Sequence, residues 1–138
     1  MPKPRVLIAD DEEGIRESLS LILSEDCEVA FASDGEEALA KLLKQPFALV
    51  LLDIKMPKLD GLEVLRRLKR ARRRIPILML TAYQSVEIAK EAVRLGALDY
   101  LPKPFERNQI LATVRGVLAQ RRPGSRGPAD GKAAQRPR

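Results

Sequence analysis

A chain of 138 residues is long enough for one ordinary domain and too short for two. Its apolar fraction of 45% excludes a wholly disordered chain, and no apolar run approaches the roughly 18 residues of a membrane span. The lack of histidine excludes His-based triads, His metal ligands and a phosphohistidine. The single cysteine, Cys27, has no partner for an internal disulfide, which favours a reducing, cytoplasmic setting.

Positive charge is concentrated at the end of the chain. The formal net charge is +6, and residues 121–138 hold six Lys or Arg residues against Asp130 alone. This segment has no hydrophobic residue larger than alanine, so it buries too little surface to offset the entropy lost on ordering. We predict one domain over residues 1–120 and a disordered basic tail or linker over 121–138.

The first half of that domain alternates strand-like and helix-like patterns. Apolar runs over 6–9 and 47–52 predict buried strands, and a weaker alternation over 29–31 predicts a half-exposed edge strand. Amphipathic spacing predicts helices over 15–23 and 34–45.

The second half repeats this unit. Amphipathic spacing predicts helices over 62–68, 86–93 and 110–118, and apolar runs predict strands over 75–80 and 98–101. Five strand–helix pairs in succession predict an α/β fold, a doubly wound five-stranded parallel sheet with helices on both faces. If the strand order is 2-1-3-4-5, as in flavodoxin, the first and third strands are neighbours.

In such a sheet, ligands bind beyond the carboxyl ends of the strands. The residues at those ends are Asp10, Asp11, Asp53, Thr81 and Lys103. Three carboxylates at one edge repel one another unless a cation compensates, and oxygen ligands without His or Cys select a hard ion such as Mg²⁺. A carboxylate there could attack a phosphoryl group held by the metal, the lysine and the hydroxyl.

Each of these residues also has a simpler interpretation when it is taken alone. Asp10 and Asp11 could cap the following helix, Thr81 could be a strand-end residue, and Tyr100 a half-buried edge aromatic. The basic run 66–74 is interpreted first as a solvated helix end, and second as an electrostatic patch for an acidic partner or nucleic acid.

The motifs together resemble the receiver domain of bacterial two-component response regulators. The resemblance covers residues 5–119 and rests on four motifs in order: Asp10-Asp11, then 53–61 (DIKMPKLDG), 80–82 (LTA) and 99–105 (DYLPKPF). Residues 82–86 and 95–97 look most like receivers of the nitrogen-regulation type.

The resemblance implies a role for each site residue. Asp53 would be the phosphoacceptor, and the receiver would catalyse its own phosphorylation and slow autodephosphorylation without being a classical enzyme. Asp11 would bind Mg²⁺ directly and Asp10 largely through water, with Asp53 and the backbone carbonyl of Lys55 completing the protein ligands. Lys103 would contact the phosphoryl oxygens.

The resemblance also implies a switch and its partners. Thr81 and Tyr100 would move inward on phosphorylation and change the surface formed by the fourth helix, the fifth strand and the fifth helix. The donor would be a sensor histidine kinase or a histidine phosphotransfer protein. The output would be an effector protein or a homodimer, because the chain after residue 120 is too short for a DNA-binding domain; no membrane partner is expected. Whether the natural protein continues beyond this chain is left open.

Three other function classes compete with this interpretation. Aspartyl-nucleophile phosphatases place a second acid two residues after the nucleophile, where this chain has Lys55. A nucleotide-binding or flavin-binding module would need a glycine-rich loop after the first strand, which is absent. Nucleic-acid binding would rest on the basic tail. A further hypothesis is that Lys55 and Tyr83 crowd the water that hydrolyses the phosphoryl group and so prolong the phosphorylated state.

Overall fold

The structure is a computed structural model of the chain and describes residues 2–82 and 86–120. The strands are β1 (Arg5–Ala9), β2 (Glu28–Ala32), β3 (Leu49–Asp53), β4 (Ile77–Thr81) and β5 (Asp99–Pro102). The helices are α1 (Glu13–Leu23), α2 (Gly35–Lys44), α3 (Gly61–Arg70), α4 (Val86–Arg94) and α5 (Arg107–Ala119). The tail predicted over 121–138, and Tyr83, lie outside the described residues.

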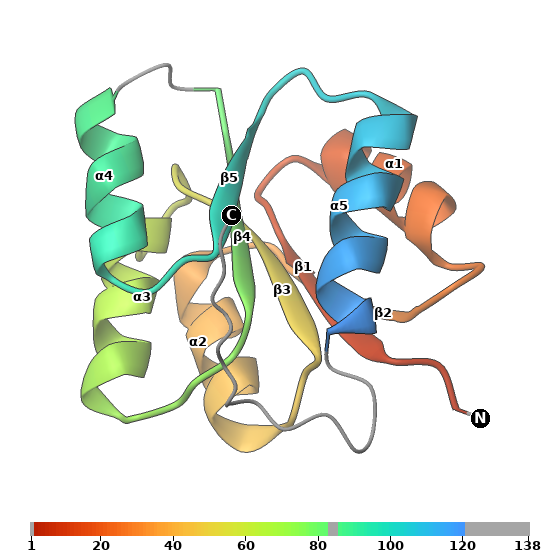
Figure 1. Cartoon of the computed structure of the whole chain (residues 1–138). Helices are drawn as coiled ribbons and strands as arrows, with labels where there is room; N and C mark the ends of the chain where they lie inside the picture. Colours follow the sequence, from red (N-terminus) through yellow and green to blue (C-terminus); the bar gives the residue numbers. More distant parts are fainter. Residues whose placement is uncertain (1, 83–85, 121–138) are drawn as a thin grey trace.

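The five strands form one parallel sheet in the predicted order, β2-β1-β3-β4-β5 (Figure 1). The fully buried β3 and β4 lie inside the sheet, and β2 is an edge strand, as the half-exposed pattern of its side chains predicted. The register pairs Ala9 of β1 with Leu52 of β3, so these two strands end side by side. The sequence therefore predicted both the fold class and the strand order correctly.

Helices cover both faces of the sheet and form two hydrophobic cores. The core beneath α1 and α5 contains Ile8, Leu19 and Ile110, among others. The core beneath α2, α3 and α4 includes Leu42 and Leu68. Figure 1 shows α1 and α5 on one side of the sheet and α2, α3 and α4 on the other. Buried apolar side chains on both faces explain why the inner strands are continuous apolar runs.

Helix α4 buries a small apolar side chain and exposes two larger ones. Apolar spacing placed the helix correctly, yet Val86 and Val93 are 66% and 58% exposed, and Ala92 is its fully buried residue. A small side chain is buried where the helix meets the sheet, and the larger valines remain in solvent. No described helix is long and apolar enough to cross a lipid bilayer.

Candidate functional site

The carboxylates of the predicted site lie at the ends of two neighbouring strands. Asp53 is the last residue of β3, and Asp10 follows β1 directly. The backbone N–H of Asp10 donates to the Ala32 carbonyl of β2 at 3.1 Å, which continues the sheet ladder by one residue. The two acids are therefore positioned by the rigid sheet.

Asp10, Asp11 and Asp53 form a compact cluster of oxygen ligands. Each offers one carboxylate oxygen, and the three oxygens lie within 4.8 Å of one another. Two ligands of an octahedral Mg²⁺ ion lie about 3.0 Å apart when adjacent and about 4.2 Å apart when opposite, so the three oxygens must draw closer together to bind one ion. Asp10 and Asp53 are buried and Asp11 is exposed, so the cluster has one side open to solvent. The donor set fits a hard divalent cation.

Lys103, which directly follows β5, supplies positive charge to this cluster. Its Nζ atom donates to Asp10 Oδ2 at 2.8 Å and lies 3.4 Å from Asp53 Oδ2 and 3.6 Å from Glu12 Oε1. The backbone N–H of Lys103 donates to the Thr81 carbonyl at 2.8 Å, and this bond positions the lysine after β5. One ammonium does not neutralise three aspartates, so the cluster retains a negative charge of about two.

Two groups in the site, Asp53 and Lys103, have raised pKa values. Burial, and then the charge of Asp10, raise the pKa of Asp53 from 3.8 to about 6, although Lys103 opposes the shift. For Lys103, burial lowers the pKa, but the hydrogen bond to Asp10 and the charges of Asp53 and Asp10 outweigh it, so the net shift is upward. Lys103 is therefore a fixed cation near neutral pH, and Asp53 is a carboxylate whose charge is costly without a metal.

The remaining predicted residues lie where parallel-sheet geometry places them. Thr81 ends β4, is 2% exposed, and follows Leu80, the register partner of Asp53. Tyr100 is half-buried on β5 and packs on the core beneath α4. Lys55 is exposed, two residues after Asp53, and its backbone hydrogen bond to the Asp53 carboxylate favours the ionised form.

Two groups that hold Asp10 in place were not predicted from the sequence. The backbone N–H of Glu12 donates to Asp10 Oδ1 at 2.9 Å, and the Arg16 guanidinium donates to the Asp10 carbonyl at 2.7 Å. Helix α1 begins at Glu13, after this turn. Asp10 therefore orders the turn before α1 and does not cap the helix. The signal in the sequence that could have predicted the first contact is the position of Glu12, two residues after Asp10.

The loop after β3 packs unusually close to the phosphoacceptor candidate. A Cβ atom on Gly61 would lie 2.3 Å from the Asp53 carbonyl oxygen, a distance that real contacts do not reach. The Gly61 N–H also donates to the Ile54 carbonyl at 2.7 Å. Only glycine allows α3 to start against the backbone of Asp53.

Comparisons with known proteins agree with this geometry. The model of the response regulator receiver domain matches residues 6–115. The chain belongs to the response regulator receiver family. Response regulator MprA of Mycobacterium leprae (strain TN) is 46% identical over 121 residues, 86% of this receiver and 53% of that protein. MprA of Mycobacterium avium (strain 104) gives the same identity and shares. The receiver spans about half the length of the curated relatives it matches.

Solved structures of receivers superpose closely on this one. The receiver domain of the Francisella response regulator 1452 has a TM-score of 0.82 at 30% identity and covers 87% of this chain and 100% of that chain. A CheY-like receiver from Methanospirillum hungatei JF-1 has a TM-score of 0.81 at 34% identity, covering 86% and 95%. NtrX from Brucella abortus, with a TM-score of 0.77 at 33% identity over 86% of this chain and 27% of that one, is consistent with the likeness to nitrogen-regulation receivers.

The predicted family is therefore confirmed, together with its fold. The chain is a receiver domain of two-component signal transduction. Asp10, Asp11, Asp53, Thr81 and Lys103, which the sequence predicted at one edge, all lie at the carboxyl ends of the strands.

Proposed function

We propose that this receiver accepts a phosphoryl group on Asp53 from a phosphohistidine of a sensor kinase or a histidine phosphotransfer protein. The observation that carries the proposal is the cluster itself: three carboxylates within 4.8 Å, with the Lys103 ammonium 3.4 Å from Asp53. A pKa of about 6 leaves about nine-tenths of Asp53 ionised at pH 7, ready to act as a nucleophile.

In the proposed transfer, an Asp53 carboxylate oxygen forms a bond to phosphorus as the P–N bond to the donor imidazole breaks. The imidazole nitrogen takes the electron pair and a proton from solvent, and Asp53 becomes an acyl phosphate. Asp10, Asp11, Asp53 and the Lys55 carbonyl would hold Mg²⁺, which neutralises charge on the phosphoryl oxygens. Lys103, whose Nζ lies 3.4 Å from Asp53 Oδ2, would stabilise the same charge.

Phosphorylation would be read out through Thr81 and Tyr100. Buried Thr81 ends the strand beside Asp53, and half-buried Tyr100 lies on the next strand, which supports a response of both residues to new charge at Asp53. Three exposed apolar residues, Val86, Val93 and Leu98, lie on α4 and just before β5. This surface suits an effector or a second copy that binds one state better than the other.

The proposal also includes the location of the protein in the cell, the role of residues 121–138 and the reset of the switch. A cytoplasmic location agrees with the single free cysteine, Cys27, which is buried at the start of β2. Residues 121–138 would be a basic tail or linker. Slow loss of the phosphoryl group by hydrolysis would reset the switch.

The deciding experiment is phosphorylation by acetyl phosphate in Mg²⁺, followed by intact mass and by peptide mapping. We expect one added phosphoryl group on Asp53, no addition in Asp53→Asn, and none with a chelator. Asp99→Asn is the matched control, because Asp99 is an exposed carboxylate at the start of β5, whereas the cluster lies beyond the ends of the strands. Phosphorylation that persists in Asp53→Asn and is insensitive to chelator would contradict the proposal.

A further inference from the structure

A groove lies at the end of the sheet opposite the carboxylate cluster. It has a volume of about 700 Å³ and is lined by the end of α3, the loop into β4 and the loop into β5. Ile77, the first residue of β4, lines it, whereas the proposed site lies beyond the last residues of the strands. A strand of five residues spans about 15 Å, so the groove is separate from the proposed phosphorylation site.

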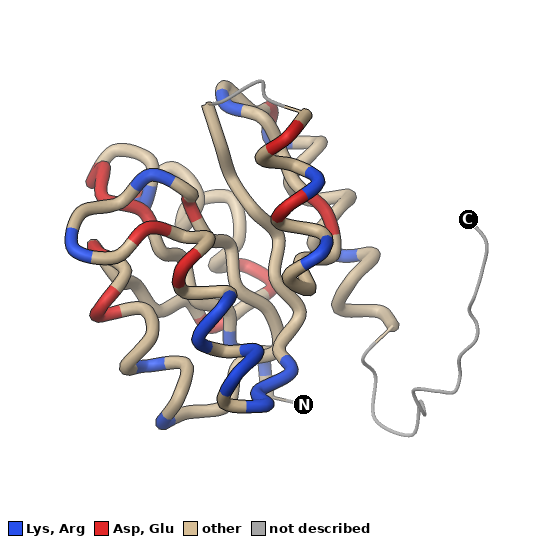
Figure 2. The backbone as a smooth tube through the Cα atoms, turned by 90° about the vertical axis from the view of Figure 1, so that its left-hand side faces the viewer, with Lys and Arg blue, Asp and Glu red and all other residues tan. Residues whose placement is uncertain are grey.

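The groove combines an apolar floor with a basic rim. Its floor includes Leu65 and Leu68, which are only 2% exposed, the half-buried Ile75 and Leu95, and Leu98, which is 54% exposed. Its rim carries four cations, Lys69, Arg72, Arg73 and Arg74. No described residue that lines it is acidic. Figure 2 shows Lys and Arg gathered at this lower end of the molecule.

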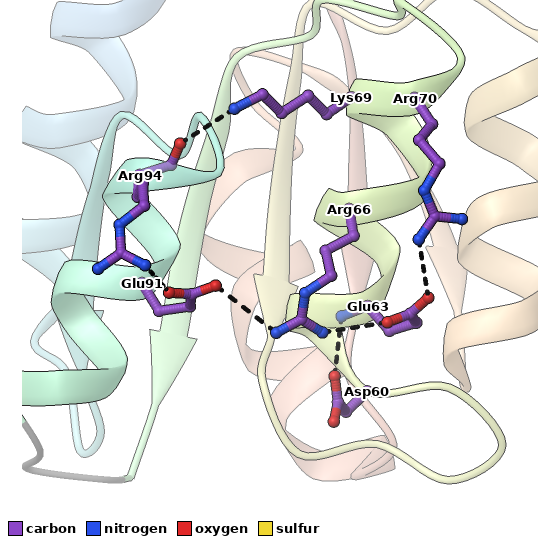
Figure 3. Close-up of polar contacts among 7 residues, drawn as sticks. All are labelled: Asp60, Glu63, Arg66, Lys69, Arg70, Glu91 and Arg94. Atoms are coloured by element: carbon purple, nitrogen blue, oxygen red, sulfur yellow. Dashed lines mark hydrogen bonds and ion pairs between the residues drawn. The ribbon is translucent and has the colours of Figure 1, made fainter.

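Acidic side chains nearby neutralise only part of this charge. The Glu63 carboxylate lies 3.0 Å from Arg66, 3.1 Å from Arg67 and 4.0 Å from Arg70, so one negative charge is shared by three guanidinium groups. Figure 3 shows Glu91 placed between Arg66 and Arg94, where it links α3 to α4. These pairs leave the end of α3 with a net positive charge.

Two of the rim cations bind backbone carbonyls. Lys69 Nζ donates to the Arg94 carbonyl at 3.4 Å (Figure 3), and Arg73 donates to the Leu42 carbonyl at 2.7 Å. Both cations stabilise helix C-termini, which is a structural role. Within the described part of the chain, Arg72 and Arg74 have no hydrogen bond from their side chains and no ion pair. Their charge is available to a ligand.

Arg72 occupies a backbone position that favours glycine. Its φ of 60° is left-handed, and its N–H donates to the Lys69 carbonyl, as in a Schellman motif that ends α3. Helix α4 ends in the same way with Gly96, whose φ is 111°. An arginine here has a conformational cost that glycine does not have, and residues retained in such conformations concentrate at functional sites.

We propose that this groove is a docking site for an acidic amphipathic segment of a partner protein. Apolar side chains of the segment would pack on Leu98 and on the half-buried Ile75 and Leu95, and its carboxylates would pair with Arg72 and Arg74. The chain's own segment 121–138, with six cations against Asp130, has the wrong sign to fill the groove. None of the described residues that line it is aromatic and could stack on bases, so an acidic protein segment fits better than single-stranded nucleic acid.

The test is fluorescence anisotropy with a labelled helical peptide of leucine and glutamate, with its leucines at i, i+3, i+4 and i+7. A scrambled peptide of the same composition is the reference ligand. We expect saturable binding of the amphipathic peptide that weakens with salt, and the same affinity for Asp53→Asn, because the groove is distant from the phosphorylation site. Arg72→Gly and Arg74→Ala should each raise the Kd about fivefold or more.

Arg72→Gly separates binding from folding. Because glycine relieves the left-handed backbone, this variant should unfold at an equal or higher temperature while its binding is weaker. Arg107→Ala, which removes an exposed cation at the start of α5, should bind the peptide like the parent protein. The proposal is overturned by no saturable binding below about 1 mM, by unchanged affinity in both groove variants, or by tighter groove-dependent binding of a labelled single-stranded DNA.

Discussion

Lys103 donates to Asp10 Oδ2 at 2.8 Å across 93 positions of sequence, and it lies farther, at 3.4 Å, from Asp53. Asp10 is fully buried and the Lys103 side chain is 12% exposed, so this pair is largely shielded from water. In the unphosphorylated state the lysine therefore stabilises Asp10 first. Phosphorylation of Asp53 would bring a second, stronger acceptor within its reach.

Lys103→Ala should lower both stability and phosphorylation. Two buried carboxylates would lose their cation, which we expect to lower the free energy of unfolding in metal-free buffer by on the order of 2 kcal/mol. Chemical denaturation measures this, and acetyl phosphate labelling should slow about tenfold or more, because Lys103 no longer stabilises the phosphoryl oxygens. Arg115→Ala is the control: Arg115 lies at the same 2.8 Å from Asp26, but at the surface, and its loss should cost under about 1 kcal/mol. Equal losses in the two variants would refute the role of Lys103.

The raised pKa of Asp53 predicts a pH-dependent stability without metal. The folded-state pKa of about 6 lies above the unfolded value of 3.8, so the unfolding free energy should fall as pH rises from about 4 to 6 and stay lower above it. The difference between parent and Asp53→Asn isolates this effect. The variant should be more stable by on the order of 2 kcal/mol at pH 7.5, and the advantage should shrink below pH 4. A pH-independent difference would contradict the raised pKa.

The site was predictable from sequence because of the topology of a parallel sheet. Every strand of such a sheet ends at the same edge, so locating the strand ends locates Asp10, Asp53, Thr81 and the stretch before Lys103 together. The spacing of motifs along the chain was therefore enough to predict the cluster. The alternating pattern alone does not fix the strand order; the order 2-1-3-4-5, which places Asp10 beside Asp53, entered as one of the common doubly wound orders and is confirmed by the pairing of β1 with β3.

Other features depend on side-chain reach and backbone detail that periodicity does not encode. The contact of Glu12 with Lys103 depends on the conformation of an exposed side chain, which the sequence pattern does not predict. Arg72 has a left-handed backbone although it is not glycine, so its residue type does not predict this conformation, whereas Gly96 is the residue type expected there. At the start of α2, Asp34 accepts from the Glu37 N–H, and the Glu37 carboxylate accepts from the N–H of Ser33, the residue before the N-cap.

Gly61→Ala should disturb Asp53 through its backbone. The added methyl would lie 2.3 Å from the Asp53 carbonyl oxygen, so the loop or the end of β3 must move. We expect a loss of 2 kcal/mol or more, on the order of an overpacked core, and slower phosphorylation in the fraction that folds. Gly116→Ala is the matched control, because nothing lies within 4 Å of its Cβ position in α5. That change should stabilise the protein by about 0.5–1 kcal/mol through helix propensity. Similar effects at both glycines would show that the packing against Asp53 is unimportant.

Asp11 offers the cleanest test of the metal proposal, because it is the exposed member of the cluster. In the described part of the chain its side chain forms no ion pair and no hydrogen bond, so Asp11→Asn should leave stability in metal-free buffer within about 0.5 kcal/mol of the parent. With Mg²⁺ the parent should gain stability as the logarithm of metal concentration once its binding is saturated, since the ion binds only the folded cluster. Asp11→Asn should need about tenfold more Mg²⁺ for the same gain in unfolding temperature.

Glu17→Gln controls for the removal of one negative charge, because Glu17 is an exposed acid on α1 outside the cluster. It should keep the parent's response to Mg²⁺. Thermal unfolding across a magnesium titration at constant ionic strength separates binding at the cluster from general screening, which would act on all three proteins alike. An identical response in Asp11→Asn, Glu17→Gln and the parent would show that the stabilisation by Mg²⁺ does not come from these carboxylates.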